Sequence, residues 1–110
     1  MKSFQKARYY QINIDAANKI IEYLYQDALI WDQLPAYKRH GRLIYFDLFQ
    51  GFMSSLKIAE ECGGLTGYQL REYRLLKRKE RDVLGTIRVL KRRDEELNKE
   101  EQDGRAKERD

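Results

Sequence analysis

The segment from Thr66 to Leu97 has two opposite faces, and this pattern constrains the fold more than any other in the chain. Apolar residues recur along it at helical spacing, and four of them are seven residues apart: Leu76, Val83, Leu90 and Leu97. Between Arg71 and Arg93 the chain carries ten basic residues against three acidic ones. At about 100° per residue, five arginines gather on the side opposite the apolar row: Arg74, Arg78, Arg81, Arg88 and Arg92. The pattern predicts one long helix with a core on one side and a basic surface on the other.

Two independent signals mark the start of this helix. Thr66 and Gln69 have the spacing of a capping box, in which each side chain bonds the backbone N–H of the other residue. Leu65 and Leu70 have the spacing of a hydrophobic staple. Two glycines precede them, and glycine after a helix adopts the left-handed conformation without a side-chain clash. We therefore predict that one helix ends just before these glycines and that the next begins at Thr66.

The seven-residue pattern is interrupted, which argues against a coiled coil. Glu80 and Asp94 occupy positions that should alternate with the four apolar residues of the repeat. Gly85 weakens a helix by about 1 kcal/mol relative to alanine. A long self-pairing coiled coil is therefore not favoured, and the helix is expected to end near Leu97.

Two further helices are expected before the basic one. Asp15 precedes a segment with helical periodicity, so it is predicted to cap a first helix from about Ala16 to Trp31. That helix carries apolar residues on several faces, which suggests contacts on more than one side and favours a homodimer. A second helix follows the turn between Pro35 and Gly41, or begins as early as Ala36, because proline is tolerated at the start of a helix.

Length and composition allow one domain. With 110 residues, 42% of them apolar, the chain can bury one core but is too short for two. We predict an all-α fold, a single three-helix domain over residues 1–98 with a long basic C-terminal helix. Residues 99–110 are highly charged and have almost no apolar content, so they are predicted to form a disordered tail.

The N-terminal segment has a second interpretation. Tyr10, Ile12 and Ile14 alternate with the amides Gln11 and Asn13, which is the period of a short, half-buried strand. The order strand, helix, helix is similar to that of the ribbon-helix-helix DNA-binding proteins. In that family two such strands pair in a dimer, and polar side chains on their outer face enter the major groove, where amides suit adenine. The resemblance implies that Gln11 and Asn13 read the bases of DNA.

This resemblance covers residues 8–30 of the chain. The family joins its two helices by a compact turn that contains glycine, whereas here a longer stretch lies between Pro35 and Gly41. The alternative of a short N-terminal strand before the helices therefore stays open from the sequence.

Catalytic and metal-binding chemistry has little support in the sequence. The chain has one histidine, His40, and one cysteine, Cys62, so no Ser/His/Asp or Cys/His set can be assembled with any redundancy. Glu60 and Glu61 have no histidine three or four residues away, as a metal site in a helix bundle requires. We expect no enzymatic activity, no metal and no cofactor. A single cysteine suits a reducing cytoplasm, and no apolar run resembles a signal peptide or a membrane span.

The basic surface suggests a function. Guanidinium groups bind phosphates in a bidentate manner, and the net charge of +4 also favours a polyanion. We expect a small nucleic-acid-binding accessory protein, with DNA as the expected partner, and the predicted contact residues are Arg71, Arg74, Arg78, Arg81, Arg88 and Arg92, together with Gln11 and Asn13. Three alternatives remain: docking on an acidic protein surface as an inhibitor or adaptor of a nucleic-acid-handling machine, a structural homo-oligomer, and a merely solvated helix face.

Overall fold

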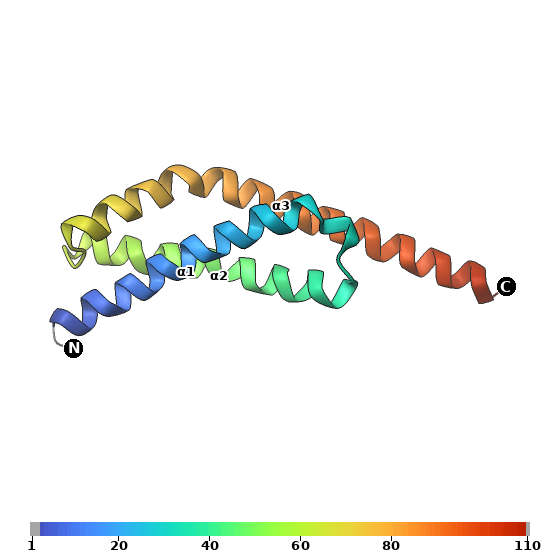
Figure 1. Ribbon diagram of the computed structural model, residues 1–110, viewed down its shortest axis with the longest axis horizontal. Coiled ribbons are helices and arrows are strands. Elements are labelled where there is room, and N and C mark those ends of the chain that lie inside the picture. The colour runs from blue at the N-terminus through green and yellow to red at the C-terminus, as the bar shows by residue number, and fades with distance from the viewer. Residues whose placement is uncertain (1–2, 110) are drawn as a thin grey trace.

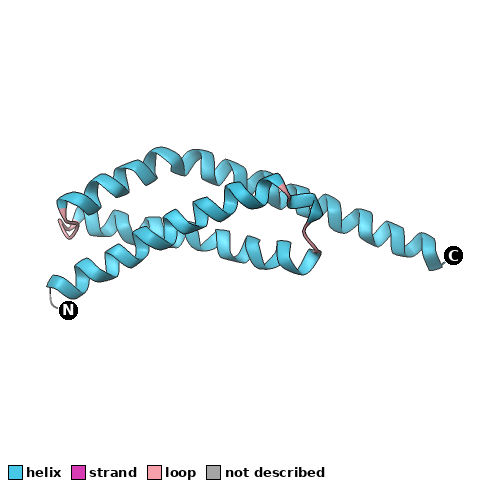
Figure 2. Ribbon diagram, in the orientation of Figure 1, coloured by secondary structure: helices cyan, strands magenta, loops and turns pink. Residues whose placement is uncertain are grey.

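Three α-helices fill nearly all of residues 3–109, the part of the chain that the computed structural model describes (Figure 1). They are α1 (Ser3–Leu29), α2 (Ala36–Glu61) and α3 (Gly67–Arg109), and a short 3-10 helix, η1 (Trp31–Gln33), follows α1. Within the described range the ribbon contains helices and loops but no strand (Figure 2). The predicted all-α class is confirmed.

The helices run up, down and up, and each one packs against the other two (Figure 1). The third helix is much the longest, with 43 residues, or about 64 Å at 1.5 Å per residue. The whole molecule measures 64 × 26 × 19 Å, so α3 sets its long axis. Figure 1 shows that the C-terminal part of α3 extends beyond the ends of α1 and α2.

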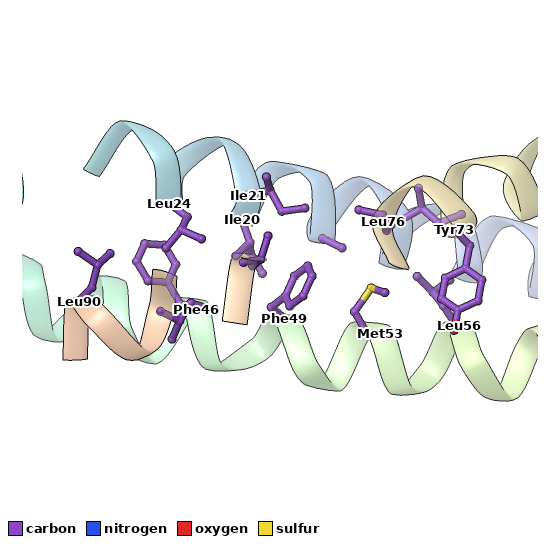
Figure 3. Packing of buried hydrophobic residues seen from close by; sticks show 14 of the residues in the cluster. Ile20, Ile21, Leu24, Phe46, Phe49, Met53, Leu56, Tyr73, Leu76 and Leu90 are labelled. Carbon is purple, nitrogen blue, oxygen red and sulfur yellow. The ribbon is translucent and has the colours of Figure 1, made fainter. Parts of the chain in front are cut away.

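The core lies between the three helices and is built from aliphatic and aromatic side chains (Figure 3). Helix α2 contributes two fully buried phenylalanines, Phe46 and Phe49. Trp31 of η1 packs near Phe46, with 6.5 Å between the ring centroids, and closes one end of the core. Of the four apolar residues seven apart in α3, the first three are buried and Leu97 is half-buried, as the predicted two-faced helix requires.

The predicted N-terminal strand and the predicted cap at Asp15 are wrong. Helix α1 begins at Ser3, and Asp15 is an exposed residue in its middle. Tyr10 and Ile14 are four residues apart, so they fit the inward face of a helix as well as alternate positions of a strand. Ile12 separates the two interpretations, because a strand would place it on the same face as Tyr10 and Ile14, and it is 57% exposed.

The predicted boundary between α2 and α3 is confirmed in detail. Gly63 has a φ of +68°, the left-handed conformation expected after a helix. The backbone N–H of Gln69 donates to Thr66 Oγ1, and the backbone N–H of Thr66 donates to Gln69 Oε1, both at 3.1 Å. Gln69 Nε2 also donates to the carbonyl of Ala7 at 2.7 Å, which ties the start of α3 to α1. At the other end of α2, the earlier of the two predicted starts, Ala36, is correct.

A buried arginine near the start of α2 joins this helix to α3 and to the segment that precedes α2. Arg39 is 2% exposed, and its Nε donates to Asp94 Oδ1 of α3 at 2.7 Å. Its two other nitrogens donate to the carbonyl of Leu34, to Asn98 Oδ1 at 3.1 Å and to Glu101 Oε1 at 3.4 Å. Burial opposes the charge, but the hydrogen bonds to Asp94 and Glu101 outweigh it and raise the pKa of Arg39 above its ordinary value.

This network explains why α3 does not end at Leu97. Asp94, which interrupts the apolar row, is itself buried because it pairs with Arg39. Asn98 and Glu101 lie one and two turns further along, and both accept hydrogen bonds from the same guanidinium group. The helix continues to Arg109. The division of the chain at residue 98 into a domain and a tail stays a prediction.

A second buried charge lies between α1 and α2. Asp27 is 6% exposed, and Arg42 Nε lies 3.0 Å from its Oδ2 in an ion pair that lacks hydrogen-bond geometry. Burial raises the pKa of Asp27 above its ordinary value of 3.8, and the charge of Arg42 offsets part of that effect. The carboxylate form of Asp27 therefore costs the folded state free energy.

Replacing Arg39 with alanine should destabilise the protein strongly. The variant leaves the Asp94 carboxylate buried without its partner, which costs about 3–5 kcal/mol of unfolding free energy. Urea denaturation followed by helical circular dichroism measures this loss. Arg93→Ala is the matched control, because Arg93 also pairs with acidic residues but does so at the surface, and its loss should be much smaller. Equal losses in the two variants would contradict the central role of Arg39.

Replacing Asp27 with asparagine should change how stability depends on pH. Because folding raises the pKa of this carboxyl group, its protonated form favours the folded state, and that advantage disappears as the pH rises through the folded pKa. The unfolding free energy of Asp27→Asn minus that of the wild type should therefore be more positive near pH 7 than near pH 3. Urea denaturation of both proteins at both pH values measures this difference. Arg42→Ala removes the offsetting charge and should enlarge the pH dependence of the wild-type aspartate. If the difference in unfolding free energy between the variant and the wild type does not change with pH, then burial does not raise the pKa of Asp27.

Candidate nucleic-acid interface

All six predicted arginines of α3 are exposed to solvent. They lie on the face of the helix that points away from the core, and they are Arg71, Arg74, Arg78, Arg81, Arg88 and Arg92. The buried residues Leu76, Val83 and Leu90 hold the opposite face against α1 and α2, so the orientation of the arginines follows from the packing of the core. We call these six residues the arginine row.

The arginine row keeps its charge free of acidic partners. In the described part of the chain, the basic residues of α3 that form ion pairs are Lys91 and Arg93, and neither is a member of the row. Arg93 donates to both carboxylate oxygens of Asp32 in η1, at 2.9 and 2.6 Å, and to Glu96 at 3.1 Å. Some basic residues of α3 are thus neutralised by acidic residues of the same chain, and the arginine row is exposed to solvent instead.

The reason for this division is the position of each residue around the helix. Arg93 follows Arg92 by about 100°, which brings it to the side where η1 places Asp32. The hydrogen bond from Arg93 lowers the pKa of Asp32 below its ordinary value, so this pair is charged on both sides at neutral pH. Arg88 borders a hollow that Asp47 and Gln50 of α2 also line, but Asp47 pairs with Lys91. In the described structure no acidic group of another helix forms an ion pair with a member of the row.

The row has a denser and a sparser part. From Arg71 to Arg92 it extends over 21 residues, about 32 Å along the helix axis. Four of the six arginines lie between residues 71 and 81, each three or four positions from the next, and the remaining two follow after a gap around Gly85. Arg71, Arg74 and Arg78 surround the half-exposed Leu75 and form a shallow hollow with it.

Gln11 and Asn13 are not part of this surface. Asn13 is 4% exposed, and its Nδ2 donates to Ser55 Oγ of α2 at 3.2 Å. Gln11 donates to Asp15 at 2.9 Å and accepts a hydrogen bond from Gln69 of α3 at 3.3 Å. Both amides connect α1 to its neighbours. The residues that the ribbon-helix-helix resemblance assigned to base reading therefore lie in helix packing, and no strand presents them in the described range.

The remaining reactive side chains are isolated. His40 and Cys62 are both exposed and lie 22 residues apart, at opposite ends of α2, about 33 Å along the helix. Within the described residues, no three His, Cys, Asp or Glu side chains come together as they would around a metal ion. None of the described helices combines the length and the apolar character that crossing a membrane would need.

Two polar contacts in the structure were not foreseen from the sequence. The Arg39–Asp94 pair joins residues 55 positions apart, and the Asp27–Arg42 pair joins α1 to α2. The only sequence signal for the first was an aspartate at a position where the apolar row required a leucine. That signal identified Asp94 as an irregularity without identifying its partner.

The arginine row is therefore the candidate site of the described surface, a set of exposed guanidinium groups on one side of a helix whose other side is fixed in a core. Such a set can bind phosphates or carboxylates of a large partner but contains no group for proton transfer or nucleophilic attack. Comparisons of the chain with protein-family models, with curated proteins and with solved structures gave no match.

Proposed function

We propose that this protein binds nucleic acid through the arginine row of α3, as an accessory protein without catalytic activity, and that duplex DNA is its partner. The observation that carries the proposal is that six exposed arginines on one helix have no acidic partner in the described part of the chain. A cytoplasmic location, where nucleic acid is accessible, belongs to the same proposal.

The choice of arginine supports phosphate binding. Each guanidinium group is planar, remains charged at every physiological pH and can donate two parallel hydrogen bonds to one phosphate. A surface that served only solubility would be expected to mix both signs of charge along the helix, as the C-terminal part of α3 does with Arg93, Glu96 and Glu100. The row instead concentrates one sign over about 32 Å.

The rigidity of α3 also supports the proposal. The buried face of the helix and the Arg39 network fix both its rotation and its position relative to α2. The arginines are therefore presented on a preformed rod and do not have to be ordered on binding, which reduces the entropic cost of association. Contacts of this type recognise the phosphate backbone and carry no direct information about base sequence.

An acidic protein surface is the second candidate partner, and one residue favours it. Leu75 is 47% exposed in the middle of Arg71, Arg74 and Arg78. A protein partner could bury this leucine at the centre of a charged contact, as protein interfaces commonly do, whereas a phosphate backbone offers it no apolar partner. Leu75→Ser should therefore weaken binding to such a protein and leave DNA affinity nearly unchanged.

Replacing Arg74, Arg78 and Arg81 together with alanine should reduce both DNA affinity and its dependence on salt. If five or six phosphates are bound, the logarithm of the association constant should fall with a slope of about −5 against the logarithm of salt concentration. Removing three contacts should reduce the steepness of that slope by about 3. Fluorescence anisotropy with duplex DNA, single-stranded DNA and duplex RNA, each at several salt concentrations, measures affinity and slope together.

The matched control replaces three exposed basic residues of α1, Lys6, Arg8 and Lys19, with alanine. It removes the same formal charge from the protein but leaves the arginine row complete, so the slope should stay close to that of the wild type. An equal change in both triple variants would mean that net charge, and not the row, attracts the DNA. Binding by the wild type that is insensitive to salt would contradict phosphate recognition altogether.

A further inference from the structure

The outward face of α2 carries an apolar row that the helix bundle leaves uncovered. Its eight positions are separated alternately by four and three residues, the spacing at which side chains line one side of a helix in a left-handed helix pair. We call these residues the α2 stripe: Tyr37, Gly41, Ile44, Leu48, Gly51, Ser55, Ile58 and Cys62. All of them except Ser55 are exposed. The buried residues of α2, such as Phe49 and Met53, lie on another face of the helix.

The large side chains of the stripe are all at least half exposed. Their exposed fractions are 73% for Tyr37, 56% for Ile44, 50% for Leu48 and 61% for Ile58. Ile12 of α1 is also 57% exposed, and its neighbour Asn13 donates to Ser55 of the stripe. Several large apolar side chains exposed along one side of a helix are a candidate site of interaction.

The order of large and small residues in the stripe indicates which partner fits it. Two copies of the stripe can be placed side by side with their helices antiparallel. In one such register, each residue faces the residue of the other copy for which the two residue numbers add to 99. The four resulting pairs are Tyr37 with Cys62, Gly41 with Ile58, Ile44 with Ser55, and Leu48 with Gly51. Every pair combines a large side chain with a small one, so knobs on one helix face gaps on the other.

The residues beside the stripe are compatible with the same register. On one flank of the stripe, the numbers of facing residues add to 101. His40 of one copy then lies opposite Glu61 of the other, and its imidazole N–H can donate to the carboxylate. On the other flank the numbers add to 97, which brings the half-buried rings of Tyr45 and Phe52 together. Neither flank sets like charges opposite each other in this register.

We propose that a second copy of this chain docks on the α2 stripe, with the two α2 helices antiparallel and related by a twofold axis that passes between Leu48 and Gly51. The surface is self-complementary, as a twofold dimer interface must be. A parallel pairing would place Tyr37 against Tyr37 and Gly51 against Gly51, which crowds some layers and leaves voids in others. The proposal concerns assembly and does not depend on nucleic-acid binding.

Pairing through the stripe leaves the arginine row accessible. Helix α3 is bound to α2 through Arg39 and Asp47, neither of which belongs to the stripe. The second copy would cover the stripe and lie beside Asp47, which pairs with Lys91 of α3 at the edge of that surface. Each dimer would thus present two arginine rows, one from each copy.

Leu48→Glu tests the interface. The substitution should have little effect on the stability of the single chain, because Leu48 is half-exposed there. We expect sedimentation equilibrium to give twice the chain mass of 13.2 kDa for the wild type and 13.2 kDa for the variant, with unchanged circular dichroism. Leu75→Glu is the matched control, a leucine of similar exposure on α3, and it should remain dimeric. A wild type that is monomeric at every concentration, or a dimer that survives Leu48→Glu, would overturn the proposal.

Tyr37→Cys tests the register. Within one chain, positions 37 and 62 lie 25 residues apart along the same helix, about 37 Å, so they cannot form a disulfide with each other. In the proposed dimer the new thiol of one copy faces Cys62 of the other, and mild oxidation should give a covalent dimer on a non-reducing gel. The wild type and Tyr25→Cys, which changes an exposed tyrosine of α1 outside the stripe, should run as single chains.

Two results of this oxidation experiment would contradict the antiparallel register. Disulfide-linked dimers of the wild type would show that the Cys62 residues of two copies meet, as they do in a parallel pair. Absence of the covalent dimer in Tyr37→Cys, while sedimentation still gives a dimer, would show that the copies associate through another arrangement.

Discussion

The buried guanidinium group of Arg39 is the constraint on which the arrangement of the helices depends. A charge that is 2% exposed must have partners, and it finds them on the chain between α1 and α2 and on three residues of α3. Sliding α3 by one turn, about 5.4 Å, would keep the same face turned inward but would carry Asp94 away from Arg39 and break the pair. Apolar packing alone tolerates such shifts more readily, so Arg39 selects one register of α3 among several that would bury the same leucines.

The surface chemistry follows from this fixed register. The settings of arginine differ sharply on the same small bundle. Arg39 lies inside, Arg42 pairs with the buried Asp27, Arg93 pairs with Asp32 at the surface, and the arginine row has no acidic partner in the described structure. Helix rotation decides which setting each residue of α3 occupies. The free positive charge is therefore a property of the tertiary structure, because a rotated α3 would exchange the neutralised positions with the exposed ones.

The sequence predicted the parts of the fold whose signals are local. The Thr66–Gln69 capping box and Gly63 lie within seven residues of each other, and both behave as the sequence indicated. The N-terminal segment was misread because residues four apart fit a helix and a strand equally, and the exposed Ile12 resolves them only once the core is known. The Arg39–Asp94 pair was not predicted because its two members lie 55 residues apart and no local pattern connects them. The exposure of the arginines follows from helical periodicity, whereas their freedom from acidic partners depends on where η1 and α2 lie.

The proposed dimer through the α2 stripe would change how the arginine row binds a long polyanion. An exposed apolar row lowers solubility unless it is covered, and in the proposed dimer a second copy would cover it and join two arginine rows in one assembly. Two rows on one particle bind a long polyanion with an effective concentration set by their separation, provided that both can reach it. The salt dependence of a dimer that engages both rows would be about twice that of one row, since each phosphate contact releases its own counterions. If both proposals hold, the steepness of that salt dependence would report how many copies bind at once and would connect the packing of α2 to the strength of the contact made by α3.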